Sequence, residues 1–162
     1  MKLYHGTNQE IVKPNVKFSK DYLDFGKGFY LTTYQAQSEK WAMRKAARLG
    51  GQPTVNVYEL SENLNAYKIC NFETEDEPWL DYVCSCRKGA LNYQQYDLVI
   101  GKVADDDVFK TTELFLKNLW TKEKVLKELR YYQENNQVCI INQQIIEIEL
   151  VFLNSYILKN DK

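Results

Sequence analysis

The order in which β-prone and helix-forming segments follow one another constrains the fold of this chain more than any other feature. Seven short stretches have the composition or the alternation of β-strands, but helical segments separate only some of them. A doubly wound sheet needs a helix after nearly every strand, so this order predicts an α+β fold instead. The expected strands cover residues 2–5, 28–33, 54–60, 66–72, 96–103, 137–141 and 150–158.

The clearest helix is expected over residues 34–49, because its apolar residues recur on one face and Gly50 and Gly51 follow it. A loop that contains Pro78 is expected to precede a second, short helix. Residues 142–149 fit either a strand or a short helical turn. The later helices are expected over residues 79–83, 111–120 and 121–132, and residues 9–23 are expected to be irregular.

Length and composition limit the classes of protein to consider. The 162 residues are the size of one ordinary domain, and we expect a single domain over residues 1–162. The 21 Lys and Arg residues balance 22 Asp and Glu residues, so the net charge gives no indication of a nucleic-acid partner. The chain shows neither a signal peptide nor an apolar run that could span a membrane, so we expect a cytoplasmic protein without a membrane partner.

The sequence offers little to a metal ion. It has one histidine and four cysteines, and Cys84 and Cys86 lack the two-residue gap of the usual zinc knuckle. We therefore expect no metal site and reduced, mostly buried thiols.

Three short motifs in the first quarter of the chain combine residue types that a dinucleotide site would use. A histidine followed by glycine and threonine ends the first strand, a glycine-spaced loop leads into an aromatic strand, and a serine and a tryptophan follow in the helix. Each residue also has an ordinary structural explanation, in a turn or in the core. The candidates, in chain order, are His5, Gly6, Thr7, Gly26, Gly28, Phe29, Tyr30, Ser38 and Trp41.

In this order the motifs resemble those of the ADP-ribosyltransferase superfamily. The pattern is that of its His-Tyr-Glu branch, which includes diphtheria toxin and the poly(ADP-ribose) polymerases. A closer resemblance is to a bacterial family first catalogued as a domain of unknown function and grouped with that superfamily. It rests on the runs DFGKGFYLTT at 24–33, YDLVIGKVADD at 96–106 and NNQVCIIN at 135–142, and it extends from Leu3 to about Phe152.

The resemblance implies two packed, mostly antiparallel sheets with flanking helices around an NAD+ cleft. NAD+ would be the co-substrate, without a metal. His5 would bind a hydroxyl of the adenosine ribose, the backbone of Gly6 would hold the nicotinamide carboxamide, and Tyr30 would stack on the nicotinamide ring. Trp41 would cover the other face of that ring, and Ser38 would add a bond to the carboxamide.

The same resemblance gives the remaining candidates supporting roles around the dinucleotide. Gly26 and Gly28 would let their loop fold tightly beside it, and Thr7 and Phe29 would contribute to the same binding site. Two basic residues of the helix over 34–49 could also meet the diphosphate, although a solvated basic face explains them better; they are Arg44 and Arg48.

The third motif departs from the His-Tyr-Glu pattern, because Gln137 stands where the glutamate is expected. Glutamine can accept a bond from the nicotinamide-ribose hydroxyl, but it lacks the charge that would stabilise an oxocarbenium-like transition state. In the superfamily, loss of this glutamate goes with single transfer, which implies mono-ADP-ribosylation. Glu134 is the alternative if the strand begins earlier, and the aspartates at 105–107 could lend a carboxylate or form a solvated strand end.

Three functions follow as hypotheses. The first is a mono-ADP-ribosyltransferase that modifies a macromolecule, with protein the favoured acceptor; small bacterial members of this kind often act as toxins paired with an antitoxin. The second is an NAD+ glycohydrolase, in which water is the acceptor. The third is a non-catalytic module that binds NAD+ or a partner, and Gln137 is the residue that keeps it open.

Overall fold

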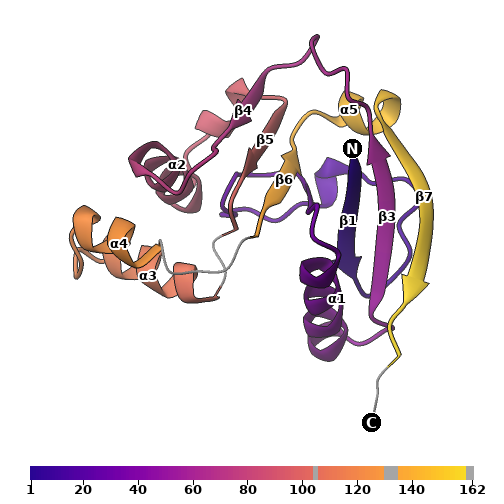
Figure 1. Cartoon of the computed structure of the whole chain (residues 1–162), viewed down its shortest axis with the longest axis horizontal. Coiled ribbons are helices and arrows are strands. Elements are labelled where there is room, and N and C mark those ends of the chain that lie inside the picture. The colour runs from indigo at the N-terminus through magenta and orange to yellow at the C-terminus, as the bar shows by residue number, and fades with distance from the viewer. Residues whose placement is uncertain (104–105, 130–134, 160–162) are drawn as a thin grey trace.

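The computed structural model describes residues 1–103, 106–129 and 135–159, and Figure 1 shows their arrangement. The strands within these residues are β1 (Lys2–Thr7), β2 (Phe29–Leu31), β3 (Thr54–Leu60), β4 (Ile69–Asn71), β5 (Leu98–Gly101), β6 (Gln137–Ile140) and β7 (Leu150–Ile157). The α-helices are α1 (Gln35–Leu49), α2 (Glu77–Arg87), α3 (Asp106–Leu116), α4 (Lys122–Leu129) and α5 (Gln143–Ile148), and single 3₁₀ turns cover Val16–Phe18 and Asn92–Gln95.

The strands form two sheets. The first has the order β1-β3-β7 and is antiparallel throughout, with a bulge in the β3–β7 pairing between Val57 and Tyr58. The second has the order β2-β6-β5-β4, and its pairs are antiparallel except for β4 with β5. The expected α+β class with two mostly antiparallel sheets is therefore confirmed.

The two sheets pack face to face and helices cover their other sides. Alternation along β1 sends Leu3 into the core between the sheets and Tyr4 to the opposite side, where α1 packs through Ala42. On the far side of the second sheet, α2 buries Trp79 among residues that include Phe25. The core between the sheets consists of Leu3, Phe29, Leu31, Tyr58, Leu60, Leu98, Val138, Ile140, Ile145 and Ile146.

The helix over 34–49 lies almost where it was expected and ends at Gly50, whose φ of 76° suits glycine. The expectation for α2 was wrong at its start, because Pro78 lies inside the first turn rather than in a preceding loop. Asp76 caps this helix by accepting a hydrogen bond from the backbone N–H of Trp79, at 3.2 Å. Proline is tolerated there because the first turn of a helix makes no use of that N–H.

The structure settles one open choice and corrects one further expectation. The open choice at 142–149 resolves as α5, because the side chain of Asn142 accepts from the backbone N–H of Gln144 at 2.9 Å and begins a helix. The helix expected from residue 111 instead begins at Asp106. Among the described residues, every helix is too short or too polar to cross a membrane.

Candidate functional site

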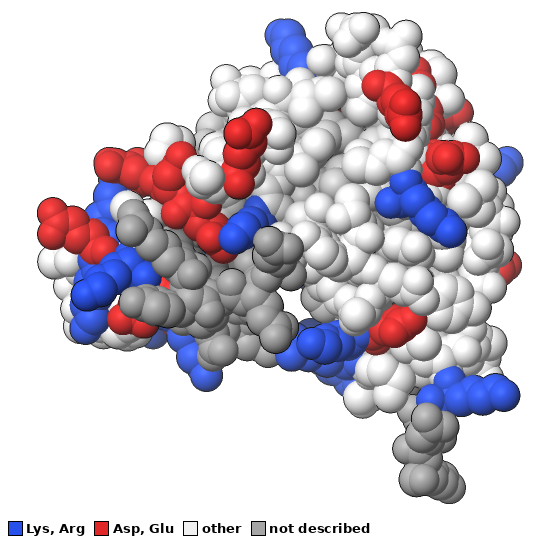
Figure 2. Space-filling view, in the orientation of Figure 1, with Lys and Arg blue, Asp and Glu red and all other residues white. Residues whose placement is uncertain are grey.

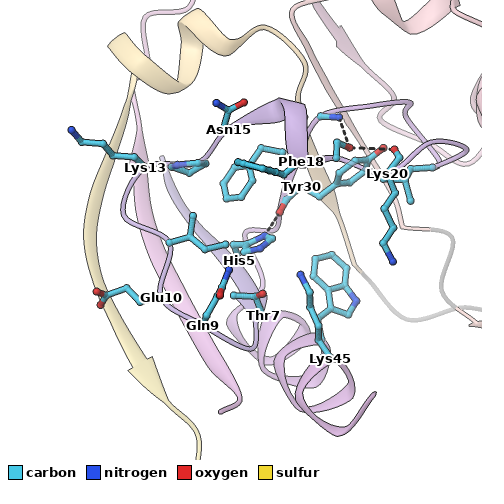
Figure 3. A pocket seen from close by; sticks show the side chains of 18 of the residues that line it. His5, Thr7, Gln9, Glu10, Lys13, Asn15, Phe18, Lys20, Tyr30 and Lys45 are labelled. Carbon is cyan, nitrogen blue, oxygen red and sulfur yellow. Dashed lines mark hydrogen bonds between the residues drawn. The ribbon is translucent and has the colours of Figure 1, made fainter. Parts of the chain in front are cut away.

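The site lies where the two sheets part. Tyr4 exchanges backbone hydrogen bonds with Thr32, at 2.8 and 2.9 Å, and this bridge joins β1 to β2. Beyond the bridge the strands separate, and the carbonyl of Tyr30 bonds to Nδ1 of His5, at 2.7 Å, instead of to a backbone N–H. A cavity of about 950 Å³ opens beside this contact, between β1, β2, α1 and the chain segment 9–20 (Figure 3).

His5 is held as a neutral ring with one defined acceptor. Its pKa is lowered from 6.5 to about 4, chiefly by burial and also by the nearby charge of Lys45, while the bond to the carbonyl of Tyr30 acts in the opposite direction. A carbonyl can only accept, so the proton of the neutral imidazole is assigned to Nδ1 and the lone pair to Nε2. The ring lies 4.6 Å from that of Phe29, centroid to centroid, which fixes its plane.

Gly6 presents its backbone at the same edge of β1. A strand repeats its backbone orientation every two residues, so the N–H and C=O of Gly6 point to the side on which Tyr4 bonds to β2. On its other side, α1 approaches so closely that an added Cβ would lie 1.8 Å from the carbonyl oxygen of Ser38. Glycine is therefore required by helix packing here, and it leaves a donor and an acceptor beside the cavity.

Tyr30 is fixed by its own loop. Its hydroxyl donates to the carbonyl of Gly26, at 2.6 Å, and accepts from the N–H of Phe25, at 3.0 Å. Burial raises the pKa of Tyr30 well above its ordinary value, so the phenol stays neutral. Tyr30 pairs with Cys139 on β6, which places both side chains on one face of the second sheet. Gln137, two residues from Cys139, shares that face.

The cavity brings together most of the residues that the sequence singled out, but not all. Its lining includes His5, Gly6, Thr7, Gly28, Phe29, Tyr30 and Trp41. Ser38 is fully buried and donates to the carbonyl of Gln35 at 2.7 Å. Gly26 has a φ of 79°, and an added Cβ would lie 2.2 Å from the ring of Tyr93, so both its conformation and its packing require glycine. The lining contains neither of these two residues, nor Gln137.

Gln137 belongs to a buried polar cluster next to the cavity. Its Nε2 donates to Oδ2 of Asp24 at 3.1 Å, and it is 4% exposed. Arg87 holds the other oxygen of Asp24 at 2.7 and 2.8 Å, and also donates to Thr112. The alternatives to Gln137 cannot be placed beside it: Glu134, Asp105 and the side chains of Asp106 and Asp107 lie outside the described residues.

The segment 9–20 forms one wall of the cavity. Its sequence has no regular pattern that would predict this role. Asn56 of β3 is fully buried; its Oδ1 accepts from the N–H of Ile11 at 2.7 Å and its Nδ2 donates to the carbonyl of Gln9 at 3.1 Å. Tyr58 donates to the carbonyl of Ile11. Gln143 of α5 bonds to the segment as well. A buried asparagine in an alternating strand was the available signal, but it does not reveal its partner.

The cavity wall is positively charged. Burial lowers the pKa of Lys45, and the neighbouring charges of Lys20 and Arg48 lower it further, so these cations lie close together. Arg44 and Arg48 are exposed, as a solvated face would be, yet both border the cavity. Figure 3 shows Lys13 on one side of His5 and Lys20 and Lys45 on the other, and Figure 2 shows basic side chains gathered over α1.

The described residues contain no group of three His, Cys, Asp or Glu side chains placed to hold a metal ion. Comparison with protein families finds one whose description is "Protein of unknown function (DUF3990)", and its model matches residues 1–152. Comparison with curated proteins and with solved structures finds no match.

Proposed function

The chain belongs to the DUF3990 family, and from the geometry of its site we propose that it binds NAD+ beside His5 and transfers ADP-ribose to a macromolecule. The observation that carries this proposal is the parting of β1 from β2. It leaves a neutral imidazole and the backbone groups of Gly6 side by side at a cavity of about 950 Å³. That volume is within the range of roughly 300 to 1,000 Å³ typical of cofactor sites.

The residues suit the two ends of NAD+ differently. Nε2 of His5 would accept a hydrogen bond from a ribose hydroxyl of the adenosine half. The N–H and C=O of Gly6 match the acceptor and donor of a carboxamide, which supports a nicotinamide subsite between Tyr30 and Trp41. Ser38 would reach the carboxamide only by turning away from the carbonyl of Gln35. Lys20, Lys45 and Arg48 supply charge opposite to that of a diphosphate.

Cleavage of the nicotinamide–ribose bond requires tight binding of NAD+ and stabilisation of positive charge, and it does not require a proton donor. Nicotinamide leaves as a neutral molecule, so the step needs no general acid, while positive charge develops on the ribose. A fixed, neutral His5 and Tyr30 fit a binding role in such a reaction. Gln137 at the third motif favours a single transfer over polymer synthesis, because it can bond to the ribose but carries no charge.

We also propose an acceptor for the ADP-ribose, a protein partner and a cellular location. A protein is the favoured acceptor, and a toxin of this kind would be neutralised by an antitoxin protein. The reaction would take place in the cytoplasm, with NAD+ as co-substrate.

Incubation of the protein with labelled NAD+ and cell extract tests the proposal. We expect nicotinamide release and label on a macromolecule, and loss of both in a His5→Ala, Tyr30→Ala double variant. Tyr34→Ala is the matched control, because Tyr34 is exposed and does not line the cavity. Free ADP-ribose without labelled macromolecule would mean a glycohydrolase. Absence of nicotinamide release from the wild type would leave only a binding module.

A further inference from the structure

A carboxylate that is mostly buried lies next to the side-chain amide of Gln137. The side chain of Asp24 is 15% exposed and that of Arg87 is 9% exposed, and their ion pair closes at 2.7 Å. The second oxygen of Asp24 accepts from Nε2 of Gln137 at 3.1 Å. Three elements meet in this cluster: the loop before β2, the last turn of α2 and the first residue of β6.

The carboxylate decides which way the amide of Gln137 faces. An ionised carboxylate can only accept hydrogen bonds, so the NH₂ end of the amide must lie toward Asp24. The carbonyl oxygen, Oε1, then points away from Asp24. It accepts no hydrogen bond from any residue that the structure describes. An amide held in this way offers an acceptor, which is what the ribose hydroxyl of NAD+ requires.

The cluster also lies on the appropriate face of the second sheet. Tyr30 is directly opposite Cys139, and Gln137 is the diagonal neighbour, at a spacing of roughly 7 to 8 Å between Cα atoms. Asp24 immediately precedes Phe25, whose N–H bonds to the hydroxyl of Tyr30. The aromatic ring, the amide and the carboxylate are thus built from neighbouring positions.

The same contacts explain why residue 137 is a glutamine. A glutamate there would bring a second carboxylate to about 3 Å from Asp24, a distance at which two carboxylates resist being ionised together. Arg87 already pairs with the carboxylate that is present. Among the residues that the structure describes, the carboxylate of this cluster is that of Asp24, which lies one hydrogen bond away from the position of a third-motif glutamate.

We propose that Asp24 is a positioning residue that acts through Gln137, so that the Asp24–Gln137 pair replaces the single glutamate of the His-Tyr-Glu pattern. Gln137 does not line the cavity in the protein without NAD+, so its amide oxygen meets the ribose only when the dinucleotide enters the corner beside Tyr30. The carboxylate behind the amide then polarises it and adds negative charge near the developing cation. This inference rests on the proposed transferase function.

A double-variant cycle on nicotinamide release tests the pair. Asp24→Asn removes the charge and lets the amide turn, and Gln137→Glu creates two facing carboxylates; each should lower kcat at least tenfold with a smaller change in KM. The combined Asp24→Asn, Gln137→Glu protein again holds one carboxylate and one amide. We expect it to recover to within a few fold of the wild-type kcat, which is strong non-additivity.

Control variants distinguish the positioning role of Asp24 from a general loss of structure. Asp81→Asn also removes an aspartate from an ion pair, with Lys122, but at an exposed place on α2, and kcat should not change. Thermal unfolding is measured for every variant. If Asp24→Asn does not fold, Gln137→Glu alone decides, because it leaves the Asp24–Arg87 pair in place, and wild-type kcat in that variant would overturn the inference.

The outcomes also separate the two proposals. Multiplicative losses in the cycle, with an active wild type, would overturn the positioning role while the transferase function stands. A wild type that releases no nicotinamide would overturn the proposed function, and the inference with it.

Discussion

At the scale of single residues, one hydrogen bond sets what His5 can offer. The carbonyl of Tyr30 takes the proton-bearing Nδ1, and burial keeps the ring neutral by lowering its pKa to about 4. The unfolded chain binds a proton near the ordinary pKa of 6.5. The contribution of this residue to stability is therefore complete above pH 6.5 and is lost as the pH falls toward 4.

NMR can test this state directly, because the chain has one histidine and its imidazole signals are unambiguous. We predict ¹⁵N shifts of a neutral ring protonated at Nδ1 at pH 7, and titration of the folded protein near pH 4. The His5→Asn variant identifies the signals. Titration near 6.5, or a proton on Nε2, would contradict the burial and the hydrogen bond described above.

At the scale of elements, β3 shapes the cavity from within the first sheet. Asn56 and Tyr58 bond to the backbone of the segment 9–20 and hold it as a wall, although this segment has only one 3₁₀ turn of its own. A buried amide that satisfies two backbone groups stabilises the wall, and its removal leaves both groups without a partner.

We predict that Asn56→Ala costs about 1 to 3 kcal/mol of the free energy of unfolding, the range for leaving buried groups unpaired. It should also speed tryptic cleavage after Lys17 and Lys20, because the wall is released. Asn154→Ala is the matched control, since Asn154 is exposed on β7. The two variants are compared by chemical denaturation and limited proteolysis; equal behaviour would show that the wall does not depend on β3.

The elements also show how far sequence reasoning reached. Alternation and helical periodicity located the strands and α1, because these patterns are local. The start of α2 was missed because Pro78 lies in the first turn, after the cap at Asp76, where a proline does not interrupt the helix. The order of the sequence motifs predicted that His5, Tyr30 and Trp41 would line one cavity. The contact between Asp24 and Gln137 joins residues 113 positions apart, and no local sequence pattern indicates it.

At the scale of the whole molecule, the two sheets share one core. Leu3 from β1 packs in the same cluster as Phe29 and Leu31 from β2 and Val138 from β6, and all but Phe29 are fully buried. The site lies at the edge of this core, where the sheets part. Its geometry therefore depends on both sheets being folded at once, which favours cooperative unfolding.

We predict that Leu3→Ala lowers the free energy of unfolding by about 2 to 5 kcal/mol, as large-to-small changes in cores do. Circular dichroism and the fluorescence of Trp79, measured with Trp41 and Trp120 replaced by Phe, should still give coincident transitions, since Trp79 reports on the second sheet and Leu3 belongs to the first. Leu49→Ala is the control, because Leu49 is 58% exposed, and it should change the free energy of unfolding by less than about 0.5 kcal/mol. Separate transitions would mean that the sheets unfold independently.

The opening between β1 and β2 is the proposed nicotinamide site, and a crystal structure of the protein with NAD+ tests this assignment most directly. We predict that the carboxamide bonds to the N–H and C=O of Gly6, that the ring lies beside Tyr30, and that Nε2 of His5 accepts from a ribose hydroxyl. NAD+ bound elsewhere, or crystals that take up none at millimolar concentration, would contradict the account.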